Sequence, residues 1–391
     1  MCVVMKRVVD LFAGCGGMSL GFQNAGFDIV AAFEYWETAA MCYENNFGHP
    51  VFRDDLANYT SAIEKIKIQN PDIIIGGPPC QDFSHAGKRI EGNRANLTES
   101  YAKIISAIKP QYFVMENVDR IQKSTTYGET RKIFKDNGYG LTEVTLNASL
   151  CGVPQRRKRF FCIGALNAAD DFLLDYIKNN LDEKEMTLRD FFGESLDFDY
   201  YYRHPRNYSR RAVYTIDEPS PTIRGMNRPV PPGYPGHPND AKELDGSIRP
   251  MTTLERALVQ TFPANFKWNG NKTDMEQMIG NAVPVKLAEF VAKALLYQIE
   301  SNSSILEQHI DCDSFYKWLL VTQPLSERVK KDTVSRLRRA NSMCVVPPNP
   351  QAHYIFLLEQ SEGFKMLTPT VRSQLKRAVS LYADYKSAVQ V

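Results

Sequence analysis

Short apolar runs alternate with amphipathic segments over the first third of the chain. Residues 7–12, 29–33 and 73–75 each have the pattern of a buried strand, because they are rich in Val, Ile and Phe and are bounded by turn residues. The segment 18–25 between the first two runs has a helical pattern that ends at Gly26. Strand, turn and helix in this order predict an α/β fold with a doubly wound sheet.

A glycine-rich turn, residues 13–17, joins the first strand to the first helix. Backbone amides at such a turn approach a ligand closely, as in nucleotide-cofactor folds. Glu34 ends the second strand, where a carboxylate can bind ribose hydroxyls, and Asp55 follows a third short extended segment. Each acid alone is also compatible with a solvated turn, but in register with the glycine turn the two predict ligand contacts.

Residues 76–84 (Gly-Gly-Pro-Pro-Cys-Gln-Asp-Phe-Ser) directly follow the strand 73–75. Cys80 therefore lies on a turn at the edge of the sheet where α/β proteins bind ligands. The two prolines cannot extend the strand, and they hold the turn in a fixed shape. This context favours a presented thiol over an inert core cysteine.

Composition narrows the class of protein. The 47 basic and 45 acidic residues nearly cancel, so a nucleic-acid surface has to come from local clustering. The eight cysteines include no C-x-x-C pair and no His partner at zinc spacing, so we expect no metal. Lys6 and Arg7 interrupt the N-terminal apolar run, and no 18-residue apolar stretch occurs, so we expect reduced thiols and a cytoplasmic location.

Five motifs occur in one linear order. They are Asp-Leu-Phe-Ala-Gly-Cys-Gly-Gly (10–17), Gly-Pro-Pro-Cys-Gln (77–81), Glu-Asn-Val (116–118), Gln-Arg-Arg-Lys-Arg (155–159) and Gly-Asn-Ala-Val-Pro (280–284). In this order they closely resemble the cytosine-5 DNA methyltransferase family. The resemblance implies a Rossmann-like S-adenosylmethionine-binding sheet with a smaller, irregular target-recognition domain. It divides the chain into a catalytic domain, 1–165 and 273–300, and a target-recognition domain, 166–272.

Cytosine C5 is too weak a nucleophile to attack a methyl sulfonium unaided, and addition of a thiolate to C6 supplies the missing reactivity. The resemblance assigns this addition to Cys80 and the contact with N3 to Glu116, whose pKa must then be raised by burial. It places Arg159 at the cytosine carbonyl, and we expect Arg157 to contact the base or the DNA backbone. A solvated basic turn is the alternative for 155–159.

The resemblance also assigns the S-adenosylmethionine contacts. They are Phe12 at the adenine, Gly14 and Gly16 along the methionine part, Glu34 at the ribose, Asp55 at the adenine amino group, Tyr35 and Leu97 beside the ring, and Asn281 and Val283 at the methionine end. Tyr35 stands where tryptophan is common in the family, and Trp36 is the alternative for that role.

Double-stranded DNA is the implied substrate, and a base in a duplex has to be flipped out of the stack. We expect contacts from the loop that follows Cys80, through Gln81, Ser84, Lys88 and Arg89. Residues 200–240 are rich in Arg, Tyr and Pro, which excludes a regular helix or central strand and suits phosphate and base contacts. The candidate DNA contacts in this segment are Thr222, Arg224 and Arg228. We expect the two arginines to contact guanine.

Beyond the resemblance, residues 301–391 predict a small helical extension with a basic face. Ser-Asn-Ser-Ser at 301–304 suggests a hinge, Ser326 is a candidate N-cap, and Pro369 is suited to open a helix. Contact with the DNA backbone and docking on a partner or second copy both remain open. A solvated face without function is a third interpretation.

The leading prediction is a sequence-specific DNA cytosine-5 methyltransferase with a cognate restriction endonuclease as its genetic partner. A tRNA cytosine-5 methyltransferase shares the catalytic layout, although the long Arg/Tyr/Pro segment favours duplex DNA. A catalytically silent DNA-binding regulator is a second alternative, and the intact Cys80, Glu116 and Arg159 argue against it. A generic adenosine-cofactor enzyme is the weakest alternative, because only the glycine turn supports it.

Overall fold

The computed structural model describes residues 5–79, 97–207, 209–308, 311–343, 355, 358–359 and 361–389. The chain divides into two compact units, Met1–Leu296 (unit 1) and Tyr297–Val391 (unit 2). No helix in the described part of the chain is long and apolar enough to cross a membrane.

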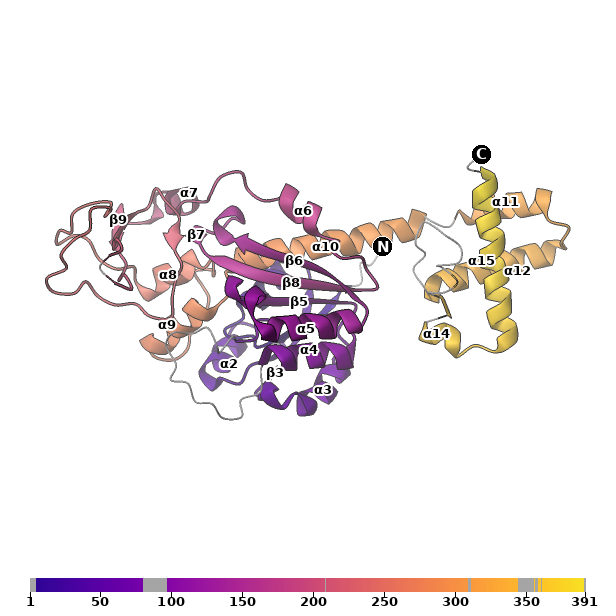
Figure 1. The fold of residues 1–391 in the computed structure, drawn as a ribbon, viewed down its shortest axis with the longest axis horizontal. Coiled ribbons are helices and arrows are strands. Elements are labelled where there is room, and N and C mark those ends of the chain that lie inside the picture. Colours follow the sequence, from indigo (N-terminus) through magenta and orange to yellow (C-terminus); the bar gives the residue numbers. More distant parts are fainter. Residues whose placement is uncertain are drawn as a thin grey trace. The chain divides into compact units, whose positions relative to one another are not determined.

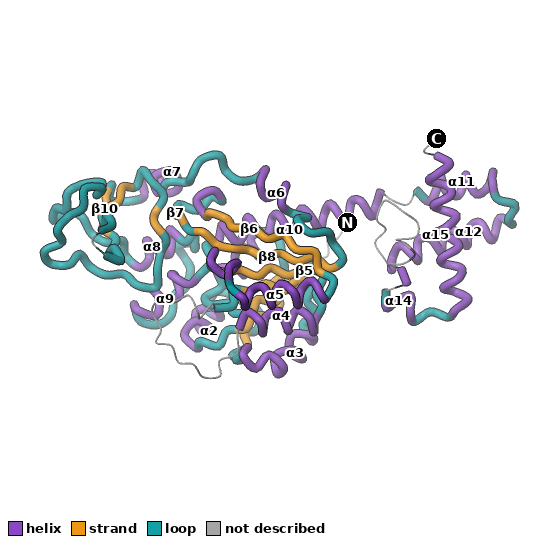
Figure 2. Tube along the Cα trace, in the orientation of Figure 1, coloured by secondary structure: helices purple, strands orange, loops and turns teal. Residues whose placement is uncertain are grey.

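A seven-stranded mixed sheet forms the centre of unit 1, with strand order β3-β2-β1-β4-β5-β8-β6 (Figures 1 and 2). The strands are β1 (Arg7–Leu11), β2 (Asp28–Phe33), β3 (Val51–Phe52), β4 (Ile73–Gly76), β5 (Tyr112–Asn117), β6 (Tyr139–Asn147) and β8 (Lys158–Leu166). The first five are parallel, and β8 runs antiparallel to both β5 and β6. The strand order reverses between β1 and β4, which is where open α/β sheets bind ligands. The predicted α/β class is confirmed.

Helices cover both faces of this sheet, as buried parallel strands require. They are α1 (Gly17–Asn24), α2 (Glu37–Glu44), α3 (Tyr59–Ile68), α4 (Leu97–Ile108), α5 (Thr125–Asp136) and α10 (Val285–Gln308), with short 3₁₀ turns η1 (Leu56–Asn58), η3 (Asp119–Lys123) and η4 (Ala148–Leu150). Figure 1 shows α3, α4 and α5 on one side of the sheet and α10 on the other. A Cβ atom on Gly21 would lie 2.5 Å from Cβ of Ala288, so a side chain there would separate α1 from α10.

The predicted strands occur with small shifts at their ends. All three isoleucines of the run 73–75 are fully buried in β4. Strand β5 continues through Glu116 and ends at Asn117. The cause is the antiparallel neighbour β8, which pairs with β5 as far as Asn117 and Phe160.

An irregular region with short elements follows β8. It contains α6 (Leu174–Asn179), α7 (Leu188–Phe192), η5 (Gly193–Ser195), β9 (Tyr200–Tyr202), β10 (Val213–Thr215), β11 (Ser220–Pro221), α8 (Thr253–Val259) and α9 (Lys272–Asn281). Tyr201 and Tyr214 pair across β9 and β10 and pack in a small core with Ile223. Strand β11 pairs in parallel with β7 (Gln155–Arg156), which joins this region to the catalytic sheet.

Unit 2 is helical and has its own hydrophobic core. Its helices are α11 (Cys312–Thr322), α12 (Glu327–Met343), α14 (Glu362–Lys365) and α15 (Pro369–Val389), and α10 reaches into it. Buried residues from α11, α12 and α15, among them Phe315, Leu337 and Leu375, form the core. Ser326 accepts a hydrogen bond from the backbone N of Val329 at 3.4 Å, and Pro369 opens α15, as predicted.

The hinge predicted at 301–304 is wrong, because α10 runs through these residues to Gln308. Ser and Asn reduce helix stability by less than about 1 kcal/mol each relative to Ala. The apolar pattern resumes directly afterwards at Ile305 and Leu306, so the short polar run does not end the helix.

Candidate active site

A cavity of about 600 Å³ lies at the carboxyl ends of the central strands. Residues of all five sequence motifs line it, from Asp10 near the N-terminus to Val283 near the end of unit 1. The sheet brings the first four motifs to one edge, and α9 returns the last motif to the same place. The fold therefore assembles the five motifs into one site.

Glu34 fixes the glycine turn at one end of the cavity. Its carboxylate accepts hydrogen bonds from the backbone N of Gly14 and of Trp36, both at 2.7 Å. Burial raises the pKa of this carboxyl, while the two amides act in the opposite direction. Phe12 on the same turn has a φ of 59°, which costs about 1–3 kcal/mol for a residue with a side chain. Strain of this kind is typical of ligand sites.

Eight of the nine residues predicted to bind the cofactor line the cavity. They are Phe12, Gly14, Glu34, Tyr35, Asp55, Leu97, Asn281 and Val283, and the alternative Trp36 lines it as well. Gly16 does not belong to the lining, and a Cβ atom there would lie 2.4 Å from the ring of Phe47. The absence of a side chain at Gly16 therefore lets the ring of Phe47 pack closely against the turn.

The two neighbouring acids after β3 have different partners. Asp54 forms an ion pair with Lys65 at 2.8 Å. Asp55 is more exposed and accepts a hydrogen bond from the backbone N of Ala57 at 2.9 Å. Together with the aromatic side chains and Glu34, this lining suits an adenine ring, its amino group and a ribose, so the residues present fit S-adenosylmethionine.

Glu116 on β5 and Arg159 on β8 form an ion pair on the wall of the cavity. Nε of Arg159 lies 2.9 Å from Oε1 of Glu116, and both side chains are at most 15% exposed. Burial raises the pKa of Glu116, and the guanidinium groups of Arg159 and Arg157 partly oppose this shift. A Cβ atom on Gly77 would lie 3.0 Å from Oε2 of Glu116, so glycine lets the turn after β4 approach the carboxyl group.

Asn117 is a site residue that the sequence reasoning missed. Its Nδ2 donates a hydrogen bond to the carbonyl oxygen of Pro78 at 2.9 Å, and its Oδ1 accepts from the backbone N of Val118 at 2.9 Å. The side chain is almost fully buried. Its place directly after Glu116 in the third motif is the signal that could have identified it.

The predicted nucleophile and four predicted DNA contacts lie outside the described residues. They are Cys80, Gln81, Ser84, Lys88 and Arg89. The described chain stops at Pro79 and resumes at Leu97, and both of these residues line the cavity.

Arg157 is buried, unlike the other arginines of its motif. Its guanidinium donates hydrogen bonds to the carbonyl oxygens of Ile223 (2.9 Å), Gly280 (2.9 Å) and Ala282 (3.0 Å). Burial lowers the pKa of this group well below its ordinary value. This placement differs from the contact with the base or the DNA backbone expected from the sequence, because backbone carbonyls of the protein already use both Nη atoms.

Gln155 also forms hydrogen bonds to residues that follow β8 in the chain. Its Nε2 donates to Oε1 of Gln260 at 2.8 Å, and its Oε1 accepts from the backbone N of Ile223 at 2.8 Å. Thr222 donates from its hydroxyl to the carbonyl oxygen of Arg156 at 2.8 Å. Residues 155–157 therefore hold the segment 220–223, which precedes the predicted base-reading arginines.

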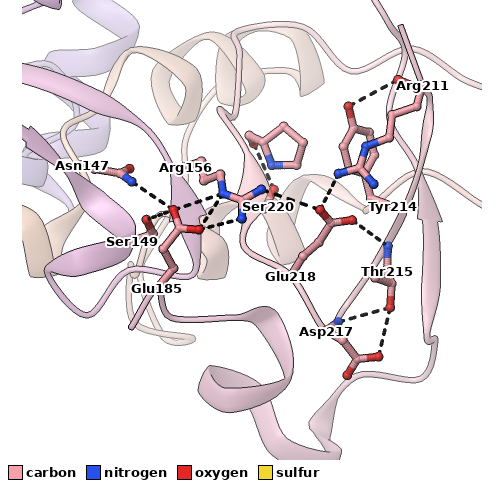
Figure 3. Close-up of polar contacts among 11 residues, drawn as sticks. Asn147, Ser149, Arg156, Glu185, Arg211, Tyr214, Thr215, Asp217, Glu218 and Ser220 are labelled. Atoms are coloured by element: carbon pink, nitrogen blue, oxygen red, sulfur yellow. Dashed lines mark hydrogen bonds and ion pairs between the residues drawn. The ribbon is translucent and has the colours of Figure 1, made fainter. Parts of the chain in front are cut away.

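A surface ion network joins the same regions (Figure 3). Arg156 pairs with Glu185 at 2.6 Å and lies 3.9 Å from Glu218. Glu218 also pairs with Arg211, whose guanidinium lies 4.2 Å from the centroid of the Tyr214 ring. The network connects β7 to the hairpin of β9 and β10.

The two predicted guanine contacts differ in exposure. Arg224 is half-buried and donates a hydrogen bond to the carbonyl oxygen of His204, and burial lowers its pKa to about 10. Arg228 is exposed, with its Nε 2.9 Å from Sδ of Met226. Both line a small cleft together with Asn227.

A model of the family described as C-5 cytosine-specific DNA methylase matches residues 6–297. The chain belongs to this family. It is an S-adenosylmethionine-dependent enzyme that methylates C5 of cytosine in DNA. In the described residues, no group of three or more His, Cys, Asp or Glu side chains is arranged to hold a metal ion.

Relatives agree with this assignment, and a solved structure agrees with the fold. The chain is 56% identical over 292 residues to the type II methyltransferase M.HindV of Haemophilus influenzae, covering 74% of this chain and 96% of the relative. It is 54% identical over 311 residues to the type II methyltransferase M.HgiDI of Herpetosiphon aurantiacus, covering 79% and 100%. The fold of the Schizosaccharomyces pombe Dnmt2 methyltransferase superposes with a TM-score of 0.60 at 20% identity, covering 75% of this methyltransferase and 99% of that chain.

Proposed function

We propose that this methyltransferase modifies one cytosine of a short duplex sequence through a covalent adduct on Cys80. The observation that carries the proposal is the shared cavity wall of Glu116, Arg159 and the turn 77–79, which leads directly to Cys80. When N3 of the flipped cytosine lies at Glu116, the pyrimidine ring lies beside that turn.

The chain's own groups prepare the ring for methylation. The Cys80 thiolate forms a bond to C6, the protonated Glu116 carboxyl donates to N3, and Arg159 donates to the cytosine carbonyl. When bound, S-adenosylmethionine supplies the electrophilic methyl group. Loss of the C5 proton to a base then restores the C5–C6 double bond and expels the thiolate.

The burial of Glu116 supports its assigned task. A carboxyl group has to be protonated near neutral pH to donate a hydrogen bond, and burial raises its pKa in that direction. The ion pair with Arg159 limits this rise in the pKa of Glu116. It therefore allows the Glu116 carboxyl group to become charged again when the adduct breaks down. Arg157 acts as a positioning residue in this proposal, since its donors hold backbone carbonyls.

The cofactor would occupy the part of the cavity between β1 and β2. Glu34 would accept from the ribose hydroxyls and Asp55 from the adenine amino group, with Phe12 and Tyr35 or Trp36 against the ring. Leu97, Asn281 and Val283 complete the lining, and Gly14 leaves the backbone open to the methionine part.

We infer that base reading falls to the segment after β11, held to the catalytic sheet by Gln155 and Thr222. Arg228 is the proposed guanine contact because it is exposed, whereas Arg224 already holds His204. The two named relatives are type II methyltransferases, so we further propose a cognate restriction endonuclease of the same specificity and action on chromosomal DNA in the cytoplasm.

Transfer of a tritiated methyl group from S-adenosylmethionine tests the proposal. Duplex DNA and tRNA are separate substrates, and Cys80→Ala is compared with Cys312→Ala, which removes a thiol from unit 2. We expect label in DNA for the wild type and Cys312→Ala, and none for Cys80→Ala. Label in tRNA alone, or undiminished transfer by Cys80→Ala, would contradict the proposal.

A further inference from the structure

Unit 2 lies outside the part of the chain that performs methyl transfer in the family. The family match ends at residue 297, where unit 2 begins. M.HindV and M.HgiDI are matched over 96% and 100% of their lengths by 74% and 79% of this chain. These relatives therefore have little or no counterpart of unit 2.

Helix α12 has one buried and one positively charged face. Val334, Leu337 and Ala340 pack in the core of unit 2. Six of its 17 residues are Lys or Arg, whereas two are acidic. Arg328, Lys331, Arg338 and Arg339 are exposed, and spacings of three and seven residues place the first three along one side of the helix. We call these four residues the basic strip.

Most of this charge is not neutralised within the protein. Lys331 pairs with Glu327 at 2.9 Å, and Lys330 is turned inward, with Nζ 3.3 Å from the carbonyl oxygen of Leu320. Arg328, Arg338 and Arg339 form no ion pair with any residue that the structure describes. Asp332 is the exposed acid beside them. Adjacent unpaired cations repel one another, and a polyanion would relieve that repulsion.

The length of the strip suits a nucleic-acid backbone. Ten residues separate Arg328 from Arg338, which is about 15 Å along an α-helix. Phosphates of one DNA strand advance about 3.4 Å each along the duplex axis, so the strip spans about four of them. DNA is the substrate of this enzyme, and Lys and Arg side chains such as those of the strip supply many of the contacts that proteins make with DNA phosphates.

We propose that the basic strip of α12 binds the phosphate backbone of duplex DNA and gives the methyltransferase additional, sequence-independent affinity. Each contact would release counterions, so binding through the strip depends steeply on salt. The contribution should be the same for DNA with and without the recognition sequence.

The test uses the full-length methyltransferase with Arg328→Gln, Arg338→Gln and Arg339→Gln combined. Binding to a duplex of unrelated sequence is measured between about 50 and 200 mM salt. The slope of log K against log salt should become shallower by up to about 2.7, since each lost phosphate contact is worth about 0.9. Methyl transfer at saturating DNA should stay at the wild-type rate.

Two controls separate the strip from general charge and from folding. Lys317→Gln, Arg377→Gln and Lys386→Gln remove three exposed cations from α11 and α15 and should leave the slope within about 0.5 of wild type. Replacing the three strip arginines by Lys keeps the charge and should preserve the slope. A wild-type slope in the Gln variant, or an equal loss in the α11/α15 control, would overturn the proposal.

Discussion

The side-chain amide of Asn117 donates a hydrogen bond of 2.9 Å to the carbonyl oxygen of Pro78. Asn117 ends β5, and Pro78 lies on the turn after the neighbouring strand β4. Cys80 follows Pro78 by two residues. Asn117 is therefore placed to fix the start of the loop that carries the proposed nucleophile.

Asn117→Ala should lower the single-turnover rate of methyl transfer by about 10- to 100-fold. The substitution leaves the Pro78 carbonyl without its buried partner, which costs about 1–3 kcal/mol and loosens the turn. Asn46→Ala is the matched control, because Asn46 also donates to a backbone carbonyl, that of Lys267 at 2.9 Å, away from the cavity. Equal rates for the two variants would contradict a positioning role.

Arg156 and Arg157 are adjacent in sequence but should respond differently to substitution. Arg157→Met leaves the buried carbonyl groups of Ile223 and Gly280 without this donor and should lower the free energy of unfolding by about 3 kcal/mol. The carbonyl of Ala282 keeps Gln260 as a donor at 3.2 Å. Arg156→Met removes exposed ion pairs and should cost less than about 1 kcal/mol. Urea unfolding of both variants provides the comparison, and similar losses would contradict a buried structural role for Arg157.

Arg228→Ala should relax base choice at one position of the recognised sequence. A guanine contact by Arg contributes about 1–3 kcal/mol of discrimination, or about 5- to 150-fold in relative rate. Methylation of duplexes that differ by single base pairs measures this change. Arg224→Ala should instead lower thermal stability, because its guanidinium holds His204. A uniform loss on every duplex for Arg228→Ala would identify a phosphate contact.

Asp10 should make the cofactor-free protein less stable as pH rises. The carboxyl group is buried beside Ser19, and burial raises its pKa from 3.8 to about 7. A raised pKa means that the folded state binds the proton more tightly than the unfolded state does. Ionisation of Asp10 therefore opposes folding, and this destabilisation grows from pH 4 and is complete above pH 7.

Asp10→Asn removes this titration and keeps an acceptor for Ser19. Relative to the variant, the wild type should lose about 2–3 kcal/mol of unfolding free energy between pH 5 and pH 8. The charge of the neighbouring Glu34 also raises the pKa of Asp10, so the difference between the two proteins includes the interaction between these two carboxyl groups. Denaturant unfolding at a series of pH values measures this difference in unfolding free energy. A difference that does not change with pH would contradict a raised pKa for Asp10.

The elements of the sheet were predictable where local pattern determines structure. The run 73–75 gives a buried strand because isoleucine favours extended backbone and the following glycines and prolines end it. The strand-end position of Glu34 and the motifs that contain Glu116 and Val283 likewise identified residues that line one cavity.

Features that depend on distant partners were not predictable. Arg157 lies in a run of basic residues that resembles a solvated turn, and its burial depends on carbonyls of Ile223 and Gly280. Gly16 faces Phe47 instead of the cavity, a packing relationship that no local pattern encodes. The polar run 301–304 resembles a hinge, yet the helix on either side continues through it.

Covalent capture of the flipped base tests the central claim most directly. Once bisulfite mapping has located the methylated position, a duplex with 5-fluorocytosine at that position is incubated with the enzyme and S-adenosylmethionine. Fluorine cannot leave C5 as the proton does, so the wild type should form a denaturation-resistant protein–DNA complex through Cys80, and Cys80→Ala should form none. Formation of the complex by Cys80→Ala, or attachment at another residue in peptide mapping, would contradict the proposed mechanism.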